Sequence, residues 1–218
     1  MKRETNLLVA CWFPAIVFDA ALLGLLLFFS FAAHGVEHGA AATVRREATD
    51  AAIATMQNGG NAIDGAVAAA LTLGIVDGAN SGIGGGCFML IRTAHGEVIA
   101  LDGREMAPAA ATHDMFVRKG KVEADLSLTG PLAIGIPGSL AVYDYALKKY
   151  GRKKLTEHLS AAADLAEEGF IIDDAFFSRM NGSVSEMKQF EATRRIFLHE
   201  DGTAKSKGER LVQSDLAN

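Results

Sequence analysis

A run of glycines in the first half of the chain constrains its fold more than any other feature. Between Gly82 and Gly86 only Ile83 carries a side chain, so the backbone there can pass close to other backbone or to a ligand. Glycine loops that bind nucleotides or phosphates follow a strand and open a helix. This run instead follows a predicted helix, opens a predicted strand and lacks the Lys-Ser/Thr ending of a phosphate loop. It therefore favours close backbone packing in a layered core, with contact near a substrate pocket as the alternative.

An arginine lies just beyond the strands that follow the glycine run. Residues 87–92 and 98–101 are predicted to form the two strands of a hairpin, so Arg104 emerges past a strand end. A guanidinium can hold a planar carboxylate with paired hydrogen bonds. We therefore expect a site for a small-molecule anion at Arg104. The alternative is that Arg104 only pairs with Glu105 or Asp102 at a surface turn.

Helices are predicted before and after this hairpin. Residues 47–58 form a predicted helix that Gly59-Gly60 ends. Asn61 can cap the next predicted helix, 62–73, and Asp64 in its first turn favours a reciprocal cap. Further predicted elements are a strand at 132–136, a helix at 139–150 after a Pro137-Gly138 turn, a helix at 155–168 that Gly169 ends, and short helical and polar pieces beyond.

The composition excludes one class of partner. The 218 residues are 50% apolar, which is enough for a sizeable core, and their formal net charge is -5. A nucleic-acid-binding protein needs Lys and Arg clustered on one face. The one dense basic stretch, 148–154, lies at the end of a predicted helix, where the helix dipole favours cations. We therefore expect no nucleic-acid partner.

The first part of the chain predicts export. Two basic residues precede a long apolar stretch that continues to Ala33, and Ser30 and Ala32 place small side chains where signal peptidase cuts. We therefore expect residues 1–33 to be a signal peptide that is cleaved at or near Ala32. The alternative is an uncleaved membrane anchor, because the stretch is long enough to cross a bilayer. In either case residues 34–218 would be periplasmic or extracellular.

Other chemistries find little support in the sequence. Cys87 is the one cysteine outside the export segment, so no internal disulfide is expected. No histidine is positioned by sequence to activate Cys87, which we expect to be a small buried residue at the start of a strand. His34 and His38 have the spacing of helical metal ligands but lie beside the predicted cleavage site, so no metal site is predicted.

Several separated blocks of the sequence follow one another in a characteristic order. They are Gln57–Ala70, Ser81–Leu90, Leu101–Pro108, Gly135–Ser139, Lys149–Gly151, Ala163–Phe170 and Leu211–Ala217. Together they resemble the large subunit of the gamma-glutamyltranspeptidases, and the resemblance runs from about Val44 to Asn218. Several blocks that occur in the order of one family identify that family far more specifically than a single glycine cluster does.

The resemblance implies a fold, an activity and a site. The fold would be the α+β, four-layered αββα fold of N-terminal-nucleophile hydrolases, with only the first part present. The activity would be transfer of a gamma-glutamyl group from glutathione or a related compound to water or an amino acid, through a gamma-glutamyl enzyme. Arg104 would be the substrate-binding residue and hold the substrate's α-carboxylate. No metal or organic cofactor is implied.

The nucleophile of the family is not found in this chain. In the family a precursor cleaves itself, and the new N-terminal threonine of the small subunit attacks the gamma-glutamyl carbonyl with its own amine as base. The one Thr-His pair, Thr112-His113, follows the Arg104 block, where the family has no processing site. We therefore predict no catalytic residue here. We expect a truncated precursor or a fragment, whose partners would be the rest of the large subunit and the small subunit of a heterodimer.

Two alternative functions stay open. A non-catalytic binding or interaction module of the cell envelope could have kept the carboxylate-binding arginine without the nucleophile. A cephalosporin-acylase-like relative would have the same fold and a different acyl donor. The residues of this chain do not decide between acyl donors.

Overall fold

The computed structural model describes residues 39–218. The predicted export segment, residues 1–33, and the histidines His34 and His38 lie outside the described residues. The described helices are α2 (Arg46–Gln57), α3 (Ala62–Val76), α4 (Ser139–Tyr150), α5 (Leu155–Glu168), α6 (Asp174–Gly182), α7 (Val184–Met187), α8 (Glu191–Phe197) and α9 (Ser214–Ala217), with two 3-10 turns, η1 (Ala124–Ser127) and η2 (Pro131–Ala133). The described strands are β1 (Cys87–Arg92), β2 (Val98–Gly103), β3 (Val117–Arg118), β4 (Lys121–Val122), β5 (Phe170–Ile171) and β6 (Arg210–Leu211).

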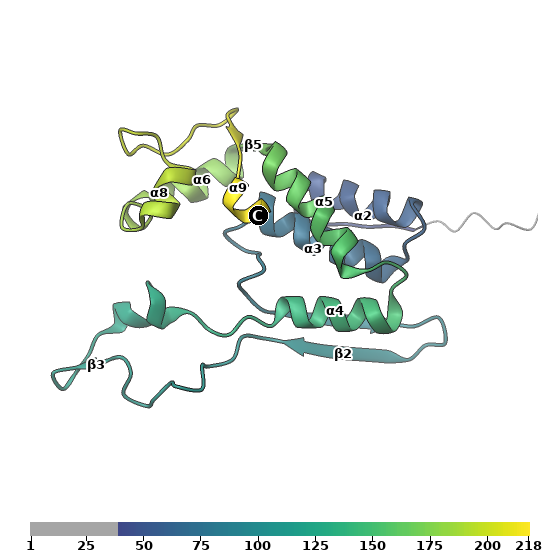
Figure 1. The fold of residues 1–218 in the computed structure, drawn as a ribbon, viewed down its shortest axis with the longest axis horizontal. Helices are drawn as coiled ribbons and strands as arrows, with labels where there is room; N and C mark the ends of the chain where they lie inside the picture. Colours follow the sequence, from purple (N-terminus) through teal and green to yellow (C-terminus); the bar gives the residue numbers. More distant parts are fainter. Residues whose placement is uncertain (1–38) are drawn as a thin grey trace, which may run out of the picture. The chain divides into compact units, whose positions relative to one another are not determined.

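Helices α2, α3 and α5 lie side by side, with α3 in contact with both of the others (Figure 1). The chain reverses between α2 and α3 at Gly59, whose φ of 88° is strained for other residues. The Asn61 side chain accepts hydrogen bonds from the N–H groups of Ile63 and Asp64, and the Asp64 carboxylate accepts the N–H of Asn61. The predicted reciprocal cap is thus confirmed, although α3 continues to Val76 rather than ending at 73.

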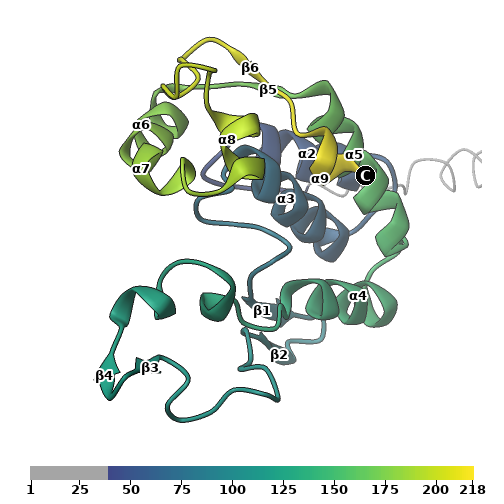
Figure 2. The ribbon, with the colours of Figure 1, turned by 60° about the vertical axis from the view of Figure 1, so that its left-hand side comes forward.

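Helix α4 joins this helical group to the hairpin. Val67 and Leu71 of α3 form a core cluster with Val142, Tyr143 and Leu147 of α4. All five are less than a tenth exposed, and full burial of such a side chain contributes about 1.5 to 3 kcal/mol. Helix α4 also packs against β1 and β2 (Figure 2).

The predicted hairpin is confirmed. β1 and β2 pair antiparallel with Cys87 opposite Gly103, so β2 extends two residues beyond its predicted end at 101. Successive side chains of a strand point to opposite faces. Ile91 is buried, whereas Phe88 and Leu90 on the other face are exposed. Among the described residues no third strand joins this pair, so its outer edges are unpaired as well.

The segment between β2 and α4 corrects one prediction. The strand predicted at 132–136 is wrong, because Pro131–Ala133 forms a 3-10 turn and only Ile136 bonds like a strand residue. Ile136 exchanges two backbone hydrogen bonds with Met106, of 2.8 and 3.2 Å. Proline at the first position of a helical turn is already fixed at a helical φ. The other residues of this stretch find no partner strand in the described part of the chain.

The last part of the chain forms a second hydrophobic core. Ile75 and Val76 of α3 and Ala166 of α5 also belong to this core, whose buried residues from the last part of the chain are Phe170, Ile172, Met180, Leu198, Ala204 and Leu211. The guanidinium of Arg45 lies 2.7 Å from the carboxylate of Asp173, which links the start of α2 to the start of α6. Between residues 39 and 218 no helix has both the length and the apolar character that a membrane span requires.

Candidate functional site

Three glycines that are distant in sequence meet where β1 begins and β2 ends. A Cβ atom on Gly86 would lie 2.7 Å from the carbonyl oxygen of Gly103 and 2.8 Å from the Cα atom of Arg104. A Cβ atom on Gly138 would overlap the same carbonyl oxygen of Gly103. Neither position accepts a side chain without a shift of backbone. The close packing predicted for the glycine run is therefore confirmed at Gly86.

Hydrogen bonds hold this crossing of chain segments together. The carbonyl oxygen of Gly85 accepts the N–H of Gly138 at 3.1 Å and the N–H of Ser139 at 3.2 Å. It also accepts the hydroxyl of Ser139 at 3.1 Å. Ser139 is almost completely buried and is the first residue of α4. The glycine run is thus tied to the start of α4 beside the end of β2.

Arg104 leaves β2 at this crossing, as predicted. Its backbone N–H donates to Oδ1 of Asp102 at 3.0 Å, and its Nη2 atom lies 3.2 Å from Oε2 of Glu105. Its Cζ atom lies 5.8 Å from the ring centroid of Phe88. The ion pair with Glu105 that the alternative interpretation expected is therefore present, whereas Asp102 contacts the backbone N–H of Arg104 and not its guanidinium. However, 56% of the Arg104 side chain is exposed, and an exposed ion pair contributes only about 0 to 1 kcal/mol, so a ligand carboxylate can replace Glu105.

Arg104 also lines an open cleft of about 480 Å³ between β2 and α4. The walls of this cleft are mostly apolar and include Leu101, Met106 and Tyr145. Of the described residues that line it, Arg104 is the one cationic side chain and Asp102 the one acidic side chain. A mostly apolar cleft with a few placed polar groups is the usual form of a small-molecule site. The arrangement can therefore bind an anionic group beside apolar atoms.

The thiol beside this crossing is not activated. Burial raises the pKa of the Cys87 thiol, and hydrogen bonds with Ser139 and Tyr143 lower it by less. A thiol with a raised pKa is protonated at neutral pH, and the thiolate is the nucleophilic form. Cys87 is half-buried at the start of β1, which supports the expected packing role.

Sequence reasoning missed the role of the buried carboxylate of Asp64. Asp64 is fully buried, and beyond the cap its oxygens accept the N–H groups of Arg152 and Lys153, at 2.9 to 3.1 Å, from the loop between α4 and α5. Burial would raise the pKa of this carboxyl, but the backbone hydrogen bonds of Asn61, Lys153 and Arg152 outweigh burial and hold the pKa below its ordinary value. Nε2 of buried His158 lies 3.6 Å away without a hydrogen bond. The capping pattern revealed Asp64, but nothing local pointed to the distant loop.

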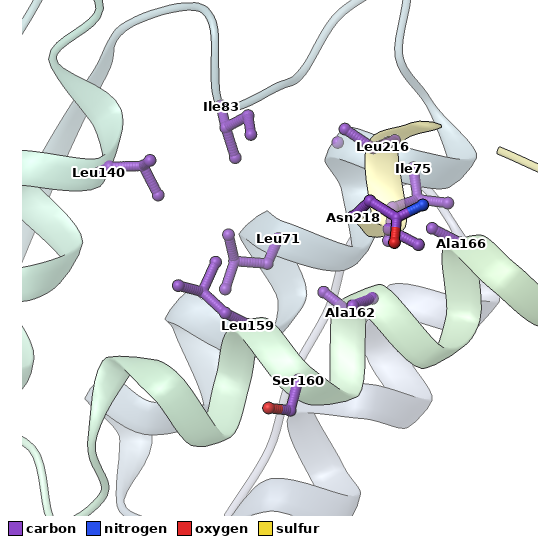
Figure 3. Close-up of a pocket in the computed structure, with 13 residues that line it drawn as sticks. Leu71, Ile75, Ile83, Leu140, Leu159, Ser160, Ala162, Ala166, Leu216 and Asn218 are labelled. Carbon is purple, nitrogen blue, oxygen red and sulfur yellow. The ribbon is translucent and has the colours of Figure 1, made fainter. Parts of the chain in front are cut away.

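Two further features of the described part carry no chemistry. Between residues 39 and 218, no three His, Cys, Asp or Glu side chains gather into a group that could hold a metal ion. Figure 3 shows a second cavity of about 480 Å³, lined by apolar side chains such as Leu71, Leu159 and Leu216. It contains no ionisable side chain and does not include Arg104.

Comparison with known proteins decides the family. A family model described as gamma-glutamyltranspeptidase matches residues 48–218. The chain belongs to the gamma-glutamyltranspeptidase family. A glutathione hydrolase proenzyme from Escherichia coli K12 is 38% identical over 182 residues, which make up 83% of this chain and 31% of that protein. The chain thus spans about a third of the length of this curated gamma-glutamyltranspeptidase relative.

Solved structures show the same fold. The gamma-glutamyltranspeptidase of Helicobacter pylori superimposes with a TM-score of 0.79 at 37% identity, over 84% of this chain and 53% of that one. The fold class is therefore the α+β fold of the N-terminal-nucleophile hydrolases, of which this chain supplies a part. A cephalosporin acylase from Bacillus halodurans, at 22% identity and a TM-score of 0.67 over 84% of this chain and 38% of that one, shares the fold alone.

Proposed function

We propose that residues 34–218 form part of the large subunit of an enzyme that transfers gamma-glutamyl groups. The donor would be glutathione or another gamma-glutamyl compound, and the acceptor would be water or an amino acid. The similarity to proteins named glutathione hydrolase proenzymes supports this proposal. The nucleophilic threonine belongs to the small subunit in this scheme, so the active enzyme is a heterodimer formed by self-cleavage.

The observation that carries the proposal is the position of Arg104. Its backbone N–H is hydrogen-bonded to Asp102, its side chain is half exposed, and the residue lines a mostly apolar cleft. A guanidinium facing a carboxylate makes two parallel charge-assisted hydrogen bonds, each worth roughly 1.5 to 3 kcal/mol. The α-carboxylate of a gamma-glutamyl donor fits this chemistry.

The role of Arg104 in the reaction would be positioning of the substrate. The α-carboxylate is the end of the glutamyl group remote from the carbonyl that the nucleophile attacks. Binding that end in one orientation restricts the translation and rotation of the substrate before the reaction, which lowers the entropic part of the barrier. Arg104 would therefore act through donor binding and take no part in the transfer of protons.

Substitution of Arg104 in the complete proenzyme tests this role. We expect Arg104→Ala and Arg104→Lys each to raise KM for a gamma-glutamyl donor about tenfold or more. Lysine cannot make the two parallel hydrogen bonds of a guanidinium. A loss of about 1.4 kcal/mol in binding corresponds to a factor of ten. Self-cleavage should persist, because it does not use the substrate carboxylate. Arg92→Ala, at the opposite end of the same hairpin, is the matched control. Normal self-cleavage with an unchanged KM in both Arg104 variants would exclude Arg104 as the carboxylate ligand.

We also propose that the protein is exported. The basic start, the apolar stretch and the small residues Ser30 and Ala32 support this. Mass spectrometry of protein from a secreting host should find a mature N-terminus near Ala33 or His34. An intact N-terminal segment in the membrane fraction would support the anchor instead.

A further inference from the structure

One aromatic side chain shares a face of the hairpin with the candidate site. Phe88 of β1 lies directly opposite Asp102 of β2, and side chains of directly opposite residues lie on the same face of a sheet. Phe88 is 70% exposed, so it contributes little to the core of the described residues. Asp102 is the residue whose carboxylate accepts the backbone N–H of Arg104.

The ring of Phe88 is in contact range of the guanidinium. The Cζ atom of Arg104 lies 5.8 Å from the ring centroid, within the distance of about 6 Å at which a cation is attracted to an aromatic face. Glu105 Oε2 lies 3.2 Å from Nη2 of the same guanidinium. Arg104 therefore has three contacts: its backbone N–H bonds to Asp102, and its guanidinium pairs with Glu105 and lies over the ring of Phe88.

We propose that Phe88 is a positioning residue that orients the guanidinium of Arg104 for the incoming carboxylate. This inference rests on the proposed function of Arg104. An arginine side chain loses rotamer freedom when it is fixed, and a planar guanidinium stacks on an aromatic ring while its N–H groups stay free to donate. When a substrate carboxylate displaces Glu105, the ring still holds the guanidinium. An aliphatic side chain at position 88 offers no such attraction.

Ring-free variants of Phe88 in the complete proenzyme test the inference. Phe88→Leu and Phe88→Met should raise KM for a gamma-glutamyl donor roughly threefold to tenfold, and Phe88→Tyr should keep the original KM because it retains the ring. Leu90→Ala is the matched control, since Leu90 is exposed on the same face of the same strand. Thermal midpoint and self-cleavage, measured for every variant, report on folding.

A double-mutant cycle separates positioning from packing. If Phe88 acts through Arg104, Phe88→Leu should have no further effect on KM in an Arg104→Ala background. An equal effect in both backgrounds, or an equal effect of Leu90→Ala, would overturn the inference. If Arg104→Ala raises KM and no ring-free variant does, the inference fails and the proposed function stands. If Arg104→Ala leaves KM unchanged, the proposed role of Arg104 fails first.

Discussion

At the residue scale, Asp64 and Arg104 show two opposite placements of charge. The carboxylate of Asp64 is fully buried, and its oxygens accept the backbone N–H of nearby Asn61 and those of Arg152 and Lys153 in a distant loop. The guanidinium of Arg104 is half exposed and, among residues 39–218, has one ion pair, with Glu105. Removing a partner from a buried charge is costly, whereas an exposed pair exchanges readily. Asp64 is therefore suited to holding the fold, and Arg104 to binding a ligand.

We expect Asp64→Asn to destabilise the complete proenzyme by about 2 kcal/mol or more at pH 7, because hydrogen bonds to a charged group contribute about 1.5 to 3 kcal/mol each and one asparagine oxygen cannot replace two. The folded-state pKa of Asp64 lies below its ordinary value, so its contribution is fully present above the unfolded-state pKa, about 3.9, and is lost as the pH falls through the folded-state pKa. Thermal midpoints between pH 3 and pH 7 measure both effects. A variant as stable as the original at pH 7, with an unchanged acid limb, would contradict this role.

At the element scale, the site depends on how closely the glycine run passes the end of β2. The glycines of the run differ in how much space surrounds them. A Cβ atom on Gly82 would meet nothing within 4 Å, whereas one on Gly86 would meet backbone atoms of Gly103 and Arg104. The start of α4 is fixed to the same place through Gly85. The position of Arg104 is thus set by contacts between elements rather than by β2 alone.

A comparison of Gly86→Ala with Gly82→Ala distinguishes the effect of a steric clash from the effect of replacing any glycine of the run. We expect Gly86→Ala to cost about 1 to 3 kcal/mol, as overpacking of a filled site usually does, and to raise KM because the backbone of Arg104 must shift. Gly82→Ala, which enters open space, should change neither quantity. Thermal denaturation and donor kinetics of the complete proenzyme measure both. Equal behaviour of the two variants would mean that the crossing does not place Arg104.

At the scale of the whole molecule, the described residues leave large apolar side chains exposed in two places. Phe88, Leu90 and Val98 on one face of the hairpin are 65 to 76% exposed. Val122 and Leu128, between β2 and α4, are each 76% exposed. Contiguous apolar patches and unpaired strand edges are sites of association.

We therefore expect residues 34–218, expressed without the rest of the proposed heterodimer, to aggregate or to form a loosely packed species. The sheet edges and apolar face of the hairpin would then meet other copies of the chain. Size-exclusion chromatography and thermal denaturation test this. A monodisperse preparation with a cooperative transition would show that the described core is sufficient by itself.

Local sequence determined most of the elements. Gly59 and Gly169 mark the ends of α2 and α5, Asn61 and Asp64 cap α3, and the hairpin before Arg104 formed as predicted. These features depend on backbone conformation and on contacts between residues close in sequence, so they can be predicted from the sequence. The order of the separated sequence blocks also indicated the family, because several motifs that occur in the same order as in one family rarely arise by chance.

Tertiary structure alone decided which distant residues meet. It brought Gly138 onto Gly103, placed the loop after α4 on Asp64, and set the ring of Phe88 beside the guanidinium of Arg104. It also left 132–136 without the partner that a strand needs. Each of these outcomes depends on the packing of whole elements against one another. Such contacts join residues far apart in the chain, so they cannot be predicted from a local sequence pattern.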